Sequence, residues 1–292
     1  MTDLTYAMPC YNHSQYLVEA LDSIKADIGT HNLEYQLLII DDGSTDDSVD
    51  VIDAWHSQNP QINLRLIKQV NHGIAKTVNK LYNTSEGQFV RLCASDDTIV
   101  AGSSAAMITA AKYDDKIECV FGDGIVIDND SKHITDSFIT YHGGNPSRFR
   151  DNVNIPDKLI ANWCIAGPCI LVRRRFFEAY QYDENSRIDD FDFFLNLFKK
   201  QGAVFYLDEQ VCAYRIHATN TSKVKDVPTR IKNLQSFCYL IEKYLNEKDL
   251  AYLKALLKSK RYLTKCKINF LKKEYIRAVI NFGLSKFYSL VS

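Results

Sequence analysis

The sequence predicts an α/β fold, a Rossmann-like, mostly parallel sheet flanked by helices, followed by a helical C-terminal extension. Three observations support this prediction. Short apolar runs alternate with helically spaced segments over residues 4–122, the run at 35–40 is unbroken, and the pattern from Arg230 onward is helical and rich in Lys, Leu and Tyr. Alternating strand and helix patterns are typical of a parallel sheet. An unbroken apolar run is typical of a strand buried on both faces.

The alternation of strands and helices is predicted in the first half of the chain. Strands are expected at 4–8, 35–40, 64–67, 89–93 and 119–122, and helices at 16–24, 49–55, 74–82 and 105–113. Polar turns separate them, and the turns at residues 41–44 and 94–97 contain paired aspartates. Ligands bind beyond the carboxyl ends of parallel strands, so both pairs are expected at a binding edge.

The later elements follow a less regular order. We expect a hairpin at 125–134, a strand at 170–172, a helix starting near Arg174, an amphipathic helix at 190–200, two strands at 204–207 and 211–215, and helices beyond Arg230. The predicted domains are an α/β domain over residues 1–222 and a basic helical extension over 223–292.

Composition excludes several classes of protein. Hydrophobic residues make up 46% of the chain and charged residues 24%, which is typical of a soluble globular protein. The longest apolar runs fall far short of the ~20 residues that span a bilayer, and the N-terminus resembles no secretory signal. The eight cysteines include no C-x-x-C pair, so buried thiols are expected rather than disulfides or zinc ligands. We therefore expect a cytoplasmic location.

Charge is unevenly distributed along the chain. Residues 223–292 contain 16 Lys and Arg against 5 Asp and Glu, an excess of 11 positive charges, while the whole chain has a net charge of −1. The remainder is therefore near −12. Such an asymmetry suggests two roles: the acidic part suits cations, and the basic part suits an anionic surface.

Four polar clusters are candidates for chemistry. Residues 41–46 and 95–97 present paired carboxylates at strand ends, which suit a ribose, a base or a hard cation such as Mg²⁺ or Mn²⁺. Residues 189–192 place three carboxylates at a helix start, where one can act as a general base. Residues 214–217 offer Arg and His for a diphosphate or a metal. Each cluster also has a plain structural reading, as a polar turn, a helix cap or a charge that complements the helix dipole.

Taken together in this order, the clusters resemble glycosyltransferase family 2, the inverting enzymes of the GT-A fold. The resemblance covers roughly residues 4–222. Two departures stand out: Asp189 replaces the usual Glu, and Val78 stands where many members have Arg. The matching motifs are Pro9-Cys10-Tyr11-Asn12, Asp41-Asp42-Gly43-Ser44-Thr45-Asp46, Asn71-His72-Gly73 with Asn79, Ser95-Asp96-Asp97, Asp189-Asp190-Phe191-Asp192 and Tyr214-Arg215-Ile216-His217.

The resemblance implies a role for each of these positions. It implies that Asp190 is the catalytic base, and that Asp189 and Asp192 orient the acceptor or the helix. It implies that Asp97 and His217 hold Mn²⁺ or Mg²⁺. The residues expected to bind the nucleotide are Pro9, Tyr11, Asp42, Lys76 and Asp96.

The expected partners follow from the same resemblance. They are a nucleotide-sugar donor, with UDP-sugars the first to test, and a glycan or lipid-linked glycan acceptor in lipopolysaccharide or capsule synthesis. The basic helices are expected to contact an anionic membrane at the inner face of the cell, a second subunit or the catalytic domain. Nucleic-acid binding is not expected, because no recognised motif accompanies the basic charge. A sugar-phosphate nucleotidyltransferase and a non-catalytic nucleotide-sugar or glycan-binding module remain as alternatives.

Overall fold

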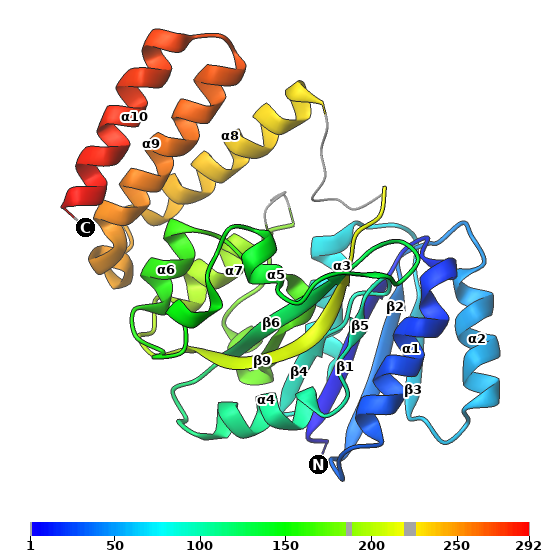
Figure 1. Ribbon diagram of the computed structural model, residues 1–292. Helices are drawn as coiled ribbons and strands as arrows, with labels where there is room; N and C mark the ends of the chain where they lie inside the picture. Colours follow the sequence, from blue (N-terminus) through cyan, green and yellow to red (C-terminus); the bar gives the residue numbers. More distant parts are fainter. Residues whose placement is uncertain (1, 185–188, 219–225, 292) are drawn as a thin grey trace. The chain divides into compact units, whose positions relative to one another are not determined.

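The computed structural model describes residues 2–184, 189–218 and 226–291. The chain forms two compact units (Figure 1). The first comprises Met1–Asn152, Cys164–Glu184 and Gly202–Ile216, and the second comprises Val153–Trp163, Asn185–Gln201 and His217–Ser292.

A single mixed sheet is the centre of the first unit. Within the described residues it has nine strands, in the order β3-β2-β1-β4-β8-β6-β9-β5, with β7 beside β6. Strands β1 to β4 are parallel, β6 is parallel to β9, and β8 runs antiparallel between β4 and β6. The predicted α/β fold is confirmed. The strand bounds are β1 Leu4–Cys10, β2 Tyr35–Asp41, β3 Leu64–Lys68, β4 Phe89–Leu92, β5 Thr98–Ile99, β6 Cys119–Ile127, β7 His133–Thr135, β8 Ile170–Arg173 and β9 Val204–Arg215.

Helices cover the parallel part of this sheet. Alternate residues of β1 and β2 pack in one hydrophobic cluster with the apolar sides of α1, α2 and α4, while α3 contacts β1 and β2. The unbroken apolar run in β2 is explained by this arrangement, because residues 37–40 are fully buried. The helices of the first unit are α1 Ser14–Ile28, α2 Ser48–Gln58, α3 Ile74–Thr84, α4 Ser103–Lys112 and the short α5 Phe138–Tyr141.

Several elements differ from their sequence predictions. The two strands expected at 204–207 and 211–215 are one strand, β9. The exposed polar residues 208–210, which separate the two apolar runs, continue the strand at the place where its register against β6 shifts. Phe121 pairs with Tyr206 and Asp123 with Gln210, so two extra residues of β9 are accommodated there. The helix expected near Arg174 is a short 3₁₀ segment, Arg174–Glu178. The two-residue strand β5 and the helices α5 and α6 were not predicted.

The second unit is helical. Trp163 packs edge-on against Phe191 and Phe194 of α7, and the ring of Phe237 in α8 lies tilted against Phe191, with 4.5 Å between the ring centres. Helix α10 packs along α9. Among the described helices, none combines the length and the apolar character that a membrane span requires. The bounds are α6 Ile155–Ala161, α7 Asp189–Leu197, α8 Val227–Tyr244, α9 Lys254–Leu271 and α10 Tyr275–Leu290.

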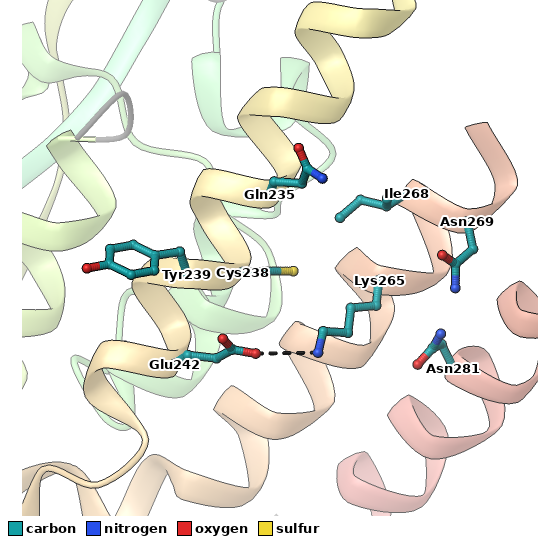
Figure 2. A pocket seen from close by; sticks show the side chains of 8 residues that line it. All are labelled: Gln235, Cys238, Tyr239, Glu242, Lys265, Ile268, Asn269 and Asn281. Atoms are coloured by element: carbon teal, nitrogen blue, oxygen red, sulfur yellow. Dashed lines mark hydrogen bonds and ion pairs between the residues drawn. The ribbon is translucent and has the colours of Figure 1, made fainter. Parts of the chain in front are cut away.

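A groove of about 370 Å³ lies among α8, α9 and α10 (Figure 2). An ion pair of 3.4 Å between Glu242 and Lys265 crosses it. All of its lining residues come from the three helices: Gln235, Cys238, Tyr239, Glu242, Lys265, Ile268, Asn269 and Asn281.

Candidate active site

The loops after β1 and β2 are bound to each other at the carboxyl edge of the sheet. The backbone N–H of Asn12 donates to Oγ of Ser44 over 2.9 Å, and Oδ1 of Asn12 accepts from the N–H of Thr45 over 2.7 Å. Oδ2 of Asp46 accepts from the N–H of Ser14 over 3.0 Å. Asn12 adopts a positive φ of 54°, a conformation that Asn tolerates better than most residues. These bonds hold the two turns as one rigid platform.

Asp42 organises a second loop beside this platform. Its carboxylate is buried and accepts hydrogen bonds from the N–H groups of His72 and Gly73, at 2.8 and 2.9 Å, and from Nε2 of Gln69 at 2.8 Å. The bonds fix the segment that leads into α3. Asp42 therefore holds the loop before α3 against the turn after β2.

Gly43 permits this close approach. It has a φ of +77°, and a Cβ added there would lie 2.8 Å from the backbone nitrogen of Asn71. Both the dihedral angle and the space exclude a side chain. The glycine of the Asp41-Asp42-Gly43 turn is thus required by the packing of two loops.

The loop after β4 brings Asp96 next to the platform. Nε2 of His13 lies 3.8 Å from Oδ2 of Asp96, and Nδ1 of His13 lies 2.8 Å from Oγ of Ser95. The side chains of His13 and Asp96 are partly exposed. The contact to Ser95 holds the imidazole so that its Nε2 faces the carboxylate.

Arg215, the last residue of β9, binds the same loop through its backbone N–H and its buried side chain. Its backbone N–H donates to Oδ1 of Asp97 over 2.7 Å, and its Nε donates to the carbonyl oxygen of Asp96 over 2.8 Å. The guanidinium is buried and pairs with Glu19 at 2.7 Å. Arg215 is therefore a positioning residue.

Asp97 faces inward, unlike its neighbour. Its side chain is buried, and burial together with the charge of Asp96 raises the pKa of Asp97 well above its ordinary value. The hydrogen bond from Arg215 satisfies the carboxylate there. The structure thus presents Asp96, and not Asp97, at the open side of this loop.

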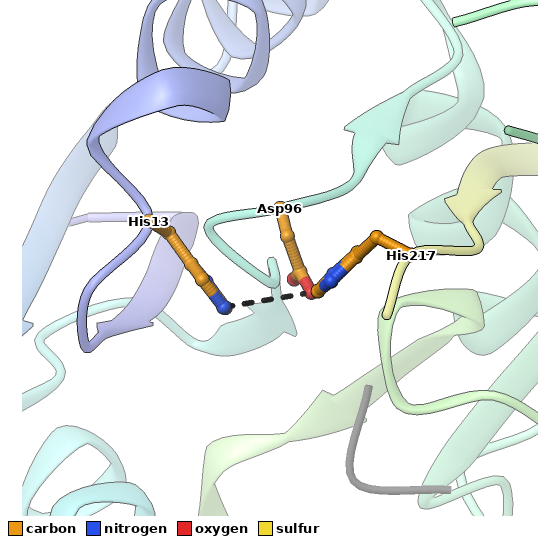
Figure 3. A group of neighbouring side chains, drawn as sticks. All are labelled: His13, Asp96 and His217. Atoms are coloured by element: carbon orange, nitrogen blue, oxygen red, sulfur yellow. Dashed lines mark ion pairs between the residues drawn. The ribbon is translucent and has the colours of Figure 1, made fainter. Parts of the chain in front are cut away.

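His217 completes a group of three ligand-type side chains (Figure 3). The boundary between the two units falls at the peptide bond before His217. His217 follows β9 after one residue, Ile216. The N–H of Ile216 donates to the carbonyl oxygen of Ile127 over 2.8 Å. One ligand atom from each of His13, Asp96 and His217 lies within 4.8 Å of the others. Imidazole nitrogens are ligands of divalent transition metals, and carboxylate oxygens are ligands of Mn²⁺ and Mg²⁺, so the donor set fits a divalent cation.

The remaining nucleotide candidates lie in the first unit. Pro9 is in β1 and half-buried, and Tyr11 is 45% exposed just beyond it. Lys76 is in α3, exposed, with its Nζ 3.7 Å from Oε2 of Glu184. The role of these residues in nucleotide binding remains a prediction.

The three acidic candidates 189–192 belong to the second unit, at the start of α7. Asp190 is half-buried. Asp192 is buried, and its Oδ1 accepts a hydrogen bond of 2.7 Å from the hydroxyl of Tyr244 in α8 and lies 3.4 Å from Nζ of Lys243. Asp192 thus joins two helices. The side chain of Asp189 lies outside the described structure.

Sequence reasoning missed two contributors to this arrangement. The sequence patterns gave His13 no role in a site, and they offered Arg215 as a diphosphate ligand. The position of His13 directly after the Pro9–Asn12 motif was an available signal, because that motif ends at the carboxyl edge of β1. The burial of Arg215 could not be predicted from the local sequence, because its hydrogen-bond partners lie about a hundred or more residues away in the chain.

Solved structures share this architecture. The structure titled as TarS 1-349 from S. aureus in complex with UDP-GlcNAc superposes with a TM-score of 0.67 at 13% identity, covering 100% of this chain and 93% of that one. The mannosyltransferase PcManGT from Pyrobaculum calidifontis, in complex with GDP-Man and Mn²⁺, gives 0.66 at 16% identity, over 95% of this chain and 73% of that one. The fold is therefore that of the GT-A glycosyltransferases.

The family follows from the sequence comparison. The model of "Glycosyl transferase family 2" matches residues 5–181, and the chain belongs to this family. The chondroitin synthase of Pasteurella multocida is 25% identical over 232 residues, which is 77% of this chain and 22% of that protein. Glycosyltransferase GlyG of Streptococcus pneumoniae is 31% identical over 97 residues, 33% of this chain and 31% of that protein. The alignments thus span less than a third of these relatives' length.

Proposed function

We propose that this chain is an inverting glycosyltransferase that moves a sugar from a nucleoside-diphosphate sugar to an acceptor hydroxyl. The observation that supports this most is the group His13, Asp96 and His217 at the carboxyl edge of the sheet in a chain of family 2. The proposed domain organisation assigns catalysis to residues 1–222, with 223–292 as an extension.

The proposed cation site differs from the sequence prediction in two ways: Asp96 takes the place of Asp97, and His13 is added to His217. We assign the divalent cation, Mn²⁺ or Mg²⁺, to Asp96, His217 and His13, while Asp97 supports the loop from inside. A cation bound there would supply Lewis-acid stabilisation of the charge on the leaving diphosphate. The contacts from Ser95 and Arg215 hold the ligand side chains in position before any ligand binds.

The nucleotide is proposed to bind along the platform. Pro9, Tyr11 and Asp42 line this part of the edge in the proposal, and Lys76 supplies a positive charge. The rigid turns at residues 10–14 and 41–46 favour this role, because a preorganised loop pays little entropy on binding. UDP-sugars are the first donors to test.

Asp190 is the proposed general base. The acceptor oxygen attacks the anomeric carbon, the bond from that carbon to the diphosphate oxygen breaks, and the proton of the hydroxyl passes to the carboxylate of Asp190. The nucleoside diphosphate leaves with the bonding electron pair. A single displacement of this kind inverts the anomeric configuration.

The proposed setting is the cytoplasmic face of a bacterial membrane. The proposed acceptor is a glycan or lipid-linked glycan in surface polysaccharide synthesis, lipopolysaccharide or capsule. The bacterial sources of the chondroitin synthases and of GlyG support this setting.

A donor panel tests the proposal. Purified protein is incubated with UDP-, GDP-, dTDP- and CMP-sugars and Mn²⁺, and release of the nucleotide is measured with and without chelator. We expect release from one donor, lost on chelation and in Asp96→Asn. We expect Asp190→Asn to lower turnover by about 10²- to 10⁴-fold while donor binding persists. Pyrophosphate release in a parallel assay with a nucleoside triphosphate and a sugar 1-phosphate would instead indicate a nucleotidyltransferase. Donor binding without turnover, even with membrane extract as acceptor, would indicate a binding module.

A further inference from the structure

Helix α10 has one face that packs on α9 and an opposite face whose large apolar side chains are exposed. On the packed side, Ala278 and Ser285 are buried, the backbone oxygen of Ser285 accepts a hydrogen bond of 2.9 Å from Ser259, and Tyr288 stacks on Tyr262 of α9. The other side is apolar and exposed. Its residues, with their exposed fractions, are Ile276 80%, Val279 71%, Ile280 57%, Phe287 57% and Leu290 85%.

The spacing of these five residues is helical. They follow one another at intervals of 3, 1, 7 and 3 residues, and Gly283 fills the gap between Ile280 and Phe287. At ~100° per residue they form a single stripe, about 100° wide, opposite the buried pair. A stripe of this size on a soluble protein marks a surface that binds another apolar phase.

Cations border the stripe. Arg277 lies along one side of it and Lys286 along the other, and α10 itself contains no Asp or Glu. The turn before α10 adds the exposed Lys272 and Lys273 and the aromatic pair Phe270 and Tyr275, whose rings are 5.7 Å apart. Over residues 254–290 there are 10 Lys and Arg and a single acid, Glu274.

We propose that α10 lies in the interface of an anionic lipid bilayer, with the stripe buried among the acyl chains and Arg277 and Lys286 at the headgroup phosphates. An amphipathic helix with basic borders binds lipid in this orientation.

A second copy of this chain fits the stripe less well. Two α10 helices face to face would bring together two helices that each carry Arg277 and Lys286 and no acid, and like charges across an interface are repulsive. An anionic surface has the complementary charge. Each basic side chain near such a surface contributes about as much as the burial of one CH₂ group.

The inference deepens the proposed function, because it names the surface at which a lipid-linked acceptor would be met. Its test needs no turnover. Vesicles of phosphatidylcholine with an equal part of phosphatidylglycerol are compared with vesicles of phosphatidylcholine alone in a sedimentation assay. We expect binding to the first and much weaker binding to the second.

Two single changes locate the contact. Val279→Asp is expected to lower the partition coefficient by more than about tenfold, with an unchanged melting temperature because the side chain is exposed. Tyr113→Asp, at an 85% exposed aromatic residue after α4, is the matched control and should leave binding unchanged. In Phe287→Trp, the emission of the new indole should shift to the blue with anionic vesicles and be quenched by brominated acyl chains.

Three results would overturn the proposal. They are no binding to anionic vesicles, equal binding by Val279→Asp and the unmodified chain, and a dimer in solution that Val279→Asp dissociates. If donor turnover fails while these binding results hold, only the proposed enzymatic function is lost.

Discussion

Nε2 of His13 faces Oδ2 of Asp96 at 3.8 Å, although the two residues are 83 positions apart in the chain. The contact joins the loop after β1 to the loop after β4, and the contact from Ser95 to Nδ1 orients the imidazole. This relationship leads to a prediction about the choice of metal.

Replacing His13 should change both the affinity for metal and the preference among metals. We expect His13→Asn to weaken Mn²⁺ binding by at least about tenfold, the loss seen even for groups that only orient a ligand. His13→Asp should favour Mg²⁺ relative to Mn²⁺, because oxygen ligands suit Mg²⁺. Loss of the free Mn²⁺ signal in electron paramagnetic resonance measures the Mn²⁺ affinity. Repeating the titration with competing Mg²⁺ measures the preference between the two metals. His133→Asn, at an exposed histidine beside Asp136, is the control, and equal affinities for both variants would contradict the prediction.

The two neighbouring aspartates should separate metal binding from folding. Asp96→Asn is expected to reduce metal affinity and leave the melting temperature unchanged, because its carboxylate is partly exposed. Asp97→Ala should lower the free energy of unfolding by about 1–3 kcal/mol, because it leaves the N–H of Arg215 without its buried acceptor.

Asp97→Asn distinguishes the two assignments. The amide oxygen can still accept from Arg215, so the fold should persist with metal affinity close to that of the unmodified chain. Loss of metal binding in this variant, with the fold intact, would instead support Asp97 as a metal ligand, the role that its motif implies.

Two glycines with the same backbone angle provide a matched test of the turn after β2. Gly43 and Gly143 both have a φ of +77°, but only Gly43 is close to another loop, at Asn71. Gly143→Ala should cost about 1–2 kcal/mol for the left-handed conformation alone. Gly43→Ala should cost more and also weaken nucleotide affinity. Chemical denaturation and titration with UDP measure the two effects, and equal losses of stability would argue against the close packing of the loops.

Asp192 is expected to stabilise the helical unit. Asp192→Ala removes the buried acceptor of the Tyr244 hydroxyl and should lower the free energy of unfolding by about 1–3 kcal/mol. Lys243→Gln should cost at most about 1 kcal/mol, because the Lys243 side chain is 42% exposed. Urea denaturation of the full chain compares them. An Asp192→Ala variant with normal stability and impaired turnover would instead support a role toward the acceptor.

Much of the first unit is predictable from local sequence. The buried strand Tyr35–Asp41, the turn that follows it and the helical spacing of α1 each depend on residues within a dozen positions. A strand covered on both faces must be apolar throughout, and a turn between a strand and a helix must be polar, so these elements leave clear local patterns. The order of the motifs along the chain also predicts the family and the edge of the sheet at which the site lies.

The tertiary structure decided the rest. The insertion of β8 between β4 and β6, and the pairing of β6 with β9, depend on contacts between distant segments. The sequence alone determined that paired aspartates follow β4, but Asp96 and Asp97 are adjacent and chemically identical. Which one is buried is decided by the N–H of Arg215, 118 residues further along the chain. A hydrogen bond of such long range leaves no local pattern, because its geometry exists only once the sheet has formed.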